Sequence, residues 1–267
     1  MARLFPQLAP TSSVAEVLTG LGLPLRALRL IVTTPKVLAL SALCGLVTAA
    51  TLIALVPFWW SHAQLWADAL IGTEATWQRW SSGAAGFVLF LLVYAVSALT
   101  VPNLVLAPLQ DPLSEATDAR CGDFTPPPFS LRQLVRGTLE SLAYTALRFG
   151  LMALGFAVLL PLNLIPGVGS ALWVAGSTLA SMFWLALEHL GNPAARHLKP
   201  FGQVVKALRA RFFLALGFGA ALWVLLWVPV VNFFLLPVAI VAGTLLYRSL
   251  VAAGHLTHPP LGNERAG

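Results

Sequence analysis

Four long stretches of the chain contain no Asp, Glu, Lys or Arg, and they set the predicted architecture. The first two run over residues 37–61 and 81–110, which makes 25 and 30 residues. A helix that crosses a bilayer needs about 20 apolar residues. A charged side chain at the bilayer centre costs roughly 2.5–3.5 kcal/mol on insertion scales. Each of these two stretches therefore predicts one transmembrane helix.

The other two charge-free stretches are of a different length. They cover residues 149–187 and 212–247, or 39 and 36 residues, too long for one helix and short for two full spans. With about seven residues in a turn, each arm of the first has about 16 residues, or about 24 Å of helix against a hydrocarbon core of about 30 Å. These counts predict two helical hairpins that penetrate half of the bilayer. Hairpins that cross the whole bilayer are the alternative, because the arms could extend to Arg148 and Arg248, whose side chains can reach the interface.

An asparagine between two prolines lies near the middle of each predicted hairpin. The first set, in "LPLNLIPGVG", is Pro161, Asn163 and Pro166, and the second, in "WVPVVNFFLLP", is Pro229, Asn232 and Pro237. A turn inside lipid leaves backbone groups without helical partners, and an Asn side chain can satisfy them while proline ends one helix and begins the next. We interpret the two asparagines as hairpin tips. A polar pore lining is the alternative, since irregular backbone at membrane depth also occurs along water-filled paths.

A third set, Pro102, Asn103 and Pro108 in "VPNLVLAP", lies near the end of the second predicted span. After it, "QDPLSEATDAR" predicts a new helix that Asp111 caps and Pro112 begins. Near the N-terminus, Ser13 and Glu16 form a capping box ahead of an amphipathic helix with Arg26 and Arg29 on its polar face, which we expect to lie along the inner leaflet.

Composition and charge fit a membrane protein. The chain is 58% hydrophobic and 10% charged, where soluble domains carry roughly 25% charged residues. Of the 16 Lys and Arg residues, only Arg79 lies in the connector 62–80. By the positive-inside rule, that connector faces outward and both termini face the cytoplasm. A cytoplasmic basic patch, which we expect to contact anionic lipid rather than nucleic acid, comprises Arg196, Lys199, Lys206, Arg209 and Arg211.

Catalysis, metals and cofactors find little support in the sequence. His189 follows Glu188, but His197 lies eight residues on, across Asn192-Pro193, and the three do not form a metal-ligand pattern. We therefore expect no enzyme activity and no cofactor. The chain is predicted to form a single membrane domain over residues 1–255 with a polar tail over 256–267.

The order of these elements resembles that of the CysZ sulfate-permease and etoposide-induced membrane protein family. The matching segments are "NLVLAPLQDPLSEATDAR", "LIPGVGSALW" and the stretch from "KPFGQVVKALRARF" to "LLPVAIVAGT". The resemblance implies an all-α membrane protein with two transmembrane helices and two half-penetrating hairpins, assembled as an oligomer. It also implies the bacterial inner membrane. Members of the bacterial branch import sulfate for cysteine synthesis, whereas others, including the eukaryotic branch, have no established transport role.

One departure from the family concerns the substrate. Its sulfate carriers have a Pro-Gly-hydrophobic-Arg-Arg run entering the first transmembrane helix, whereas this chain has "TTPKVLAL". Pro35 matches, but Lys36 replaces the glycine, and Leu38 and Ala39 replace the arginines. A single ammonium does not reproduce two guanidinium groups. We therefore expect a weaker anion site of Lys36, Arg26 and Arg29 at a helix N-terminus.

Two functions follow as hypotheses. The first is a permease or channel-like protein for a small inorganic anion. The alternative is a membrane-shaping or scaffold protein that binds anionic lipid and transports nothing.

Overall fold

The structure is a computed structural model of the whole chain. It describes residues 6, 8, 12–121, 146–197, 199–227 and 229–256, so the tail predicted over 256–267 lies almost wholly outside the described residues. Every regular element in these residues is a helix, which confirms the all-α class. The elements are α1 (Ser13–Thr33), α2 (Pro35–Ile71), α3 (Thr76–Cys121), a helix over Ala146–Leu164 that ends in the 3-10 turn η1 (Leu160–Leu164), α5 (Gly169–Arg196), α6 (Phe201–Ala210), α7 (Phe212–Leu226) and α8 (Pro229–Ala252).

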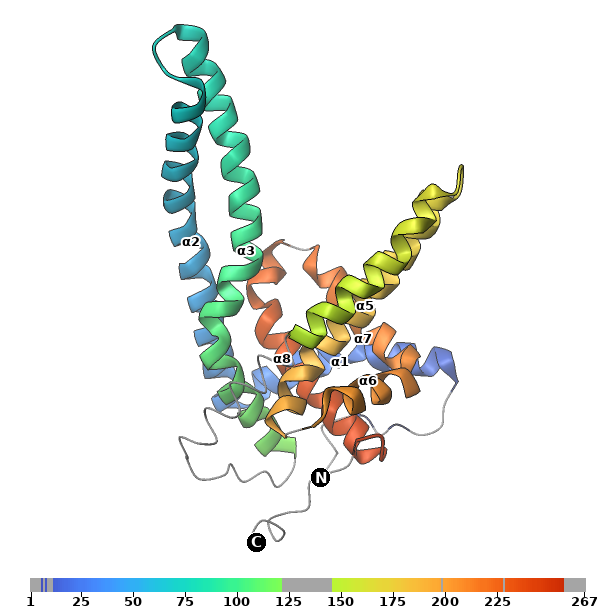
Figure 1. Ribbon diagram of the computed structural model, residues 1–267. Helices are drawn as coiled ribbons and strands as arrows, with labels where there is room; N and C mark the ends of the chain where they lie inside the picture. Colours follow the sequence, from blue (N-terminus) through green and yellow to red (C-terminus); the bar gives the residue numbers. More distant parts are fainter. Residues whose placement is uncertain are drawn as a thin grey trace, which may run out of the picture. The chain divides into compact units, whose positions relative to one another are not determined.

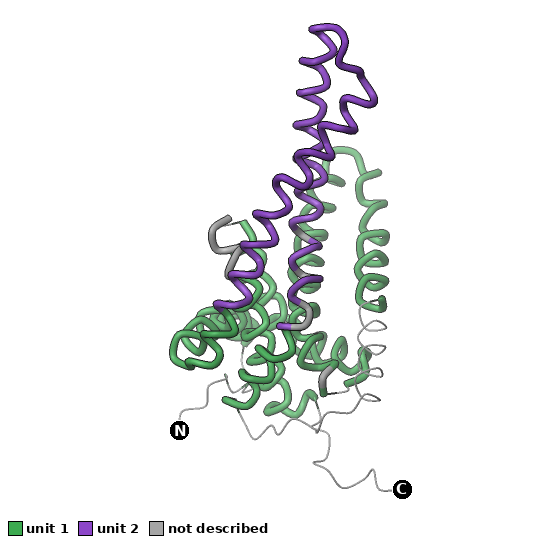
Figure 2. The backbone as a smooth tube through the Cα atoms, turned by 90° about the vertical axis from the view of Figure 1, so that its left-hand side faces the viewer, with its two compact units in different colours: residues 1–41, 110–267 green, residues 42–109 purple. Residues whose placement is uncertain are grey.

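The chain divides into two compact units, coloured green and purple in Figure 2. Unit 2 covers Ala42–Leu109 and consists of most of α2 and α3, which lie side by side. The Tyr94 hydroxyl donates to the Leu52 carbonyl at 3.4 Å, and the Trp60 ring meets Phe87 and Phe90. Gln78 stabilises the turn between the two helices, because its Oε1 accepts a hydrogen bond from the Ala75 N–H at 2.8 Å.

Helix α3 is continuous across all three of its prolines. Pro102, Pro108 and Pro112 lie inside Thr76–Cys121, so the prediction that Asp111 and Pro112 begin a separate helix was wrong. The set around Asn103 does not turn the chain either. A proline inside a helix removes one backbone hydrogen bond at a cost of about 3 kcal/mol. The contacts of residues 110–121 with α5 and α8, described below, outweigh that cost.

Unit 1 combines residues 1–41 with 110–267. Its centre is α8, where Ala239, Ile240, Leu245 and Tyr247 are fully buried. Helices α1, α5 and α7 each pack against α8, and α7 also packs against both α1 and α5. This helical core contains the sites discussed below.

Glycines allow the close helix contacts of unit 1. A Cβ on Gly20 of α1 would lie 2.4 Å from the Leu214 carbonyl oxygen, and one on Gly217 of α7 would lie 2.2 Å from the Val17 carbonyl oxygen. A Cβ on Gly243 of α8 would lie 2.3 Å from the His189 carbonyl oxygen of α5. Small residues at such crossings let helix backbones approach closely, as in membrane proteins generally.

Helix α1 differs from the prediction in two respects. Its N-cap is Ser12, whose hydroxyl accepts from the Ala15 N–H at 3.4 Å, so the predicted capping box at Ser13 was misplaced by one residue. One face of α1 is buried against α7 and α8, whereas a second apolar stripe stays exposed on the chain itself. The exposed stripe has the spacing of a helix face and comprises Val14, Leu18, Leu21, Leu25, Leu28 and Val32.

The first predicted hairpin is a helix, a tight turn and a second helix (Figure 1, yellow-green to yellow). Pro161 and Asn163 lie in η1, and Pro166 is in the turn that follows. The Asn163 amide donates to the Leu160 carbonyl at 3.4 Å, and Gly167 has a φ of 83°, which favours glycine. The amide therefore bonds the backbone at the turn, as the capping interpretation requires.

In the second hairpin α7 ends at Leu226, Trp227 lies in a turn, and α8 begins at Pro229. Asn232 and Pro237 therefore lie within α8 rather than at the tip of the hairpin. The side chains of residues 229–234 are outside the described part of the structure. Pro229 at the first helical position fits the preference of proline for helix starts.

Five helices of the described chain are long and apolar enough to cross a membrane, and a sixth span arises if α6 and α7 are counted together despite their 97° bend. The Ala146–Leu164 helix has 19 residues and Gly169–Ala195 has 27, because α5 continues through Asn192 and Pro193. These arms are longer than the 16 residues expected and reach about 28 and 40 Å.

Candidate functional site

The candidate anion site lies where α1 ends and α2 begins. Thr34 is extended between the helices, and the first hydrogen bond of α2 runs from the Leu38 N–H to the Thr34 carbonyl at 2.9 Å. The N–H groups of Lys36 and Val37 precede that bond, and the helix dipole places partial positive charge there. Such helix N-termini bind anions through their backbone.

The three cationic side chains predicted for this site are all exposed. Lys36 is the second residue of α2, and Arg26 and Arg29 lie one turn apart near the end of α1. Within the described residues, none of the three forms an ion pair with a carboxylate. Their charge is therefore not neutralised by the parts of the chain that the structure describes.

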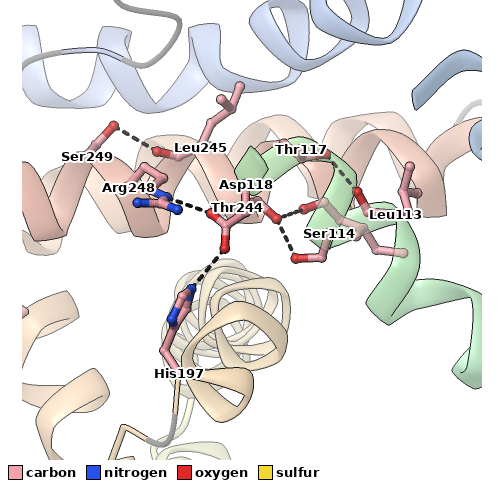
Figure 3. A network of polar contacts seen from close by, with 10 residues as sticks. Leu113, Ser114, Thr117, Asp118, His197, Thr244, Leu245, Arg248 and Ser249 are labelled. Atoms are coloured by element: carbon pink, nitrogen blue, oxygen red, sulfur yellow. Dashed lines mark hydrogen bonds and ion pairs between the residues drawn. The ribbon is translucent and has the colours of Figure 1, made fainter. Parts of the chain in front are cut away.

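A buried ionic cluster, which the sequence interpretation missed, lies elsewhere in unit 1 (Figure 3). Asp118 of α3 is fully buried. Its Oδ1 accepts from Arg248 Nε of α8 at 2.6 Å, and its Oδ2 bonds His197 Nε2 at the end of α5 at 2.8 Å. The His197 ring stacks on Tyr247, with centroids 4.9 Å apart and planes 4° apart.

Neutral hydrogen bonds extend this cluster along α3. The hydroxyls of Ser114 and Thr244 lie 2.8 Å apart, and the Asn192 amide donates to Gln110 Oε1 at 2.9 Å. These contacts join segments more than 75 residues apart in sequence, so residues 110–121 are held to both α5 and α8. Arg248, which the full-hairpin alternative would place at the interface, is buried and bonded to Asp118. An arginine within the apolar run of α8 is the sequence signal for such a partner.

The residues of the predicted cytoplasmic basic patch have different surroundings. Lys206 and Arg209 are exposed on one face of α6, whereas Lys199 is buried, and burial lowers the pKa of its ammonium group. Arg211 bonds Glu16 of α1 and His255 after α8. Arg196 is the last residue of α5, and its side chain is outside the described part.

His189 and Glu188 do not form a metal site with their surroundings. Glu188 lies 3.8 Å from Arg148, whose guanidinium also lies 5.6 Å from the Phe149 and Trp184 ring centroids. No group of three His, Cys, Asp or Glu residues within the described chain could hold a metal ion.

Long apolar helices with buried ionic groups define the chain as an α-helical membrane protein. The sequence model of the family described as Sulfate transporter CysZ/Etoposide-induced protein 2.4 matches residues 23–237. The chain therefore belongs to this family, which confirms the resemblance found in the sequence. It is a sulfate-transporter-like membrane protein in that broad sense.

Proposed function

We propose that the protein is a permease or channel-like protein for a small inorganic anion, acting in a bacterial inner membrane as a homo-oligomer with both termini in the cytoplasm. The observation that carries this proposal is the family match over residues 23–237, which includes the second half of α1 and the start of α2. The anion enters at the α2 N-terminus, where Lys36, Arg26 and Arg29 raise its local concentration. Electrostatic focusing of this kind raises association rates by 10-fold or more.

Substrate preference follows from the missing arginines. An exposed ammonium binds an anion as a point charge, without the paired N–H geometry that fits sulfate. The protein therefore discriminates little between sulfate and other small anions. Leu38 and Ala39, at the family's arginine positions, are exposed, and Ala39 lies one helical turn from Lys36, so a guanidinium group at position 39 would be close to the Lys36 ammonium.

The hairpins provide the second part of the proposal. Helix α7 has 15 residues, or about 22 Å, which is shorter than a hydrocarbon core of about 30 Å. This length favours half-penetration for the hairpin of α7 and α8. The tip of this hairpin at Trp227 then lies at membrane depth, and Asn163 at the first tip and Asn232 in the first turn of α8 contribute polar groups to the path.

Radiolabelled sulfate uptake into proteoliposomes tests this function. Uptake above that of protein-free vesicles is expected, with competition by other small oxyanions and a several-fold loss in Lys36→Gln. Arg120→Gln, which removes an exposed cation at the end of α3, is the control and should retain uptake. If the assembled protein gives no flux of any anion above the protein-free vesicles, the permease proposal fails, and the membrane-shaping or scaffold alternative becomes the better account.

A further inference from the structure

A groove in unit 1 lies between the Ala146–Leu164 helix and α6, away from the start of α2. It consists of two adjoining hollows of about 730 and 360 Å³, which share Leu151 and Phe201. The larger is lined by apolar side chains and the smaller includes Lys206 and Arg209. The groove is therefore apolar at one end and cationic at the other.

The apolar end is a single stripe on a helix. Leu147, Leu151 and Leu154 follow one another at spacings of four and three residues, so they lie on one face. Leu147 and Leu154 are 55% and 61% exposed on the chain itself. Gly150 lies between them, and a Cβ at Gly150 would meet no atom within 4 Å. This end offers an open apolar channel to a hydrocarbon chain.

The cationic end is on an amphipathic helix. Lys206 and Arg209 are one turn apart on the exposed face of α6, whereas Val204, Ala207 and Leu208 on the other face are buried. Neither cation forms an ion pair with a described residue. A phosphate group can accept hydrogen bonds from both, with the planar guanidinium of Arg209 binding two oxygens.

The direction of α6 relative to α7 fits a position of these cations at the depth of lipid phosphates. Helix α6 meets α7 at a bend of 97°, and α7 contains no charged residue. If α7 enters the hydrocarbon core, α6 lies along the membrane surface, as amphipathic helices do. The groove then runs from the headgroup level at Lys206 toward the hydrocarbon at Leu154.

We propose that this groove is a binding site for one anionic phospholipid. Its phosphate lies between Lys206 and Arg209, and one acyl chain follows the stripe of Leu147, Leu151 and Leu154. Other apolar surfaces of the chain contact lipid without selecting a headgroup, whereas two adjacent cations favour a headgroup with a net negative charge. The site is separate from the proposed anion entry, so it stands whether or not the protein transports an anion.

Native mass spectrometry of the delipidated full-length protein tests this site, with dioleoyl phosphatidylglycerol and dioleoyl phosphatidylcholine as probes. At roughly 1 kcal/mol for each basic residue near a charged membrane surface, two cations predict about tenfold or greater preference for phosphatidylglycerol. Lys206→Gln with Arg209→Gln should remove that preference. Gly150→Leu, which fills the apolar end without a clash at Cβ, should weaken the binding of both lipids. The matched control, Arg79→Gln with Arg120→Gln, removes two charges elsewhere and should leave the preference unchanged.

Four results would overturn the proposal. The first is equal retention of the two lipids by the wild type, and the second is an unchanged preference for phosphatidylglycerol in the Lys206 and Arg209 variant. The third is an equal loss of that preference in the control variant. The fourth is complete displacement of phosphatidylglycerol by inorganic phosphate at the same concentration as the lipid. A change of oligomeric mass in Gly150→Leu, with lipid retention unchanged, would assign the groove to a second copy of the chain instead. None of these readouts depends on anion flux.

Discussion

At the scale of single residues, Asp118 has no exposed surface, and its two oxygens bond an arginine and a histidine from two other segments. A buried ion pair often adds little net stability because both groups lose their hydration. Removing one partner is different, since the other charge then stays buried without compensation. Asp118 is therefore a position where one small change has a large effect.

Asp118→Asn keeps the shape of the side chain but removes the charge that Arg248 faces. We expect a loss of about 3–5 kcal/mol of stability, the usual cost of breaking a buried pair, measured as a lower melting temperature in detergent. Glu115→Gln, three residues earlier on α3, is the control and should change the melting temperature little. Equal melting temperatures for Asp118→Asn and the wild type would show that the cluster does not stabilise the fold.

We expect His255 to make the stability of the protein depend on pH. Its Nε2 accepts from Arg211 Nε at 2.8 Å, which requires an unprotonated nitrogen. Burial, and then the charge of Arg211, lower the pKa of His255 below its usual 6.5, while Glu16 acts in the opposite direction. The unfolded chain therefore binds this proton at a higher pH than the folded chain does.

This contribution to stability is fully present above pH 6.5 and is lost as the pH falls through the lowered folded-state pKa. The melting temperature of the wild type should accordingly drop between pH 6.5 and 5. His255→Gln retains an acceptor for Arg211 but cannot titrate, so it should show a smaller drop over the same range. Parallel curves for the two proteins would exclude His255 as the titrating group.

At the scale of helices, two glycines two residues apart in α1 have different surroundings. A Cβ at Gly20 would lie 2.4 Å from the Leu214 carbonyl oxygen of α7, whereas one at Gly22 would meet nothing within 4 Å. The clash at Gly20 is with backbone, which cannot rotate away.

Gly20→Ala should therefore destabilise the protein by about 1–3 kcal/mol or more, as overpacking does. Gly22→Ala should be neutral, or stabilising by about 0.5–1 kcal/mol through helix propensity. Thermal unfolding of both variants in the same detergent compares them directly. A Gly20→Ala protein as stable as Gly22→Ala would contradict the α1–α7 packing.

The sequence predicted which segments are helical better than it predicted where the helices end or which buried polar residues pair. Charge-free runs located the long apolar helices, because hydrophobic length is a strong local signal. Helix α3 could not be predicted as continuous, since prolines 102, 108 and 112 each favour a break, and only long-range packing overrides them. The partner of Arg248 was not predictable for the same reason, because Asp118 is 130 positions away. The anion site at Lys36 rested on the sequence alone and stays a prediction.

At the scale of the whole molecule, the accessibility of the hairpin tips from outside distinguishes half-penetrating hairpins from hairpins that cross the whole bilayer. In a protein with Cys44 and Cys121 replaced by alanine, single cysteines at the tip residues Val168 and Trp227 should resist an impermeant maleimide applied from outside. A cysteine at Glu74, in the connector predicted to face outward, is the control and should react. Labelling at Val168 would make the first hairpin a full crossing, which its arms of 19 and 27 residues are long enough to form.

We propose above that this chain is an anion permease whose entry site lacks the family's arginine pair. Sulfate uptake by proteoliposomes tests it most directly when the wild type is compared with the triple variant Lys36→Gly, Leu38→Arg and Ala39→Arg. Hydrogen bonds to charged groups contribute about 1.5–3 kcal/mol each, so the triple variant should take up sulfate at about tenfold lower sulfate concentrations than the wild type does. The wild type should itself take up more sulfate than empty vesicles do. Uptake no greater than that of empty vesicles by both folded and assembled proteins would contradict the claim.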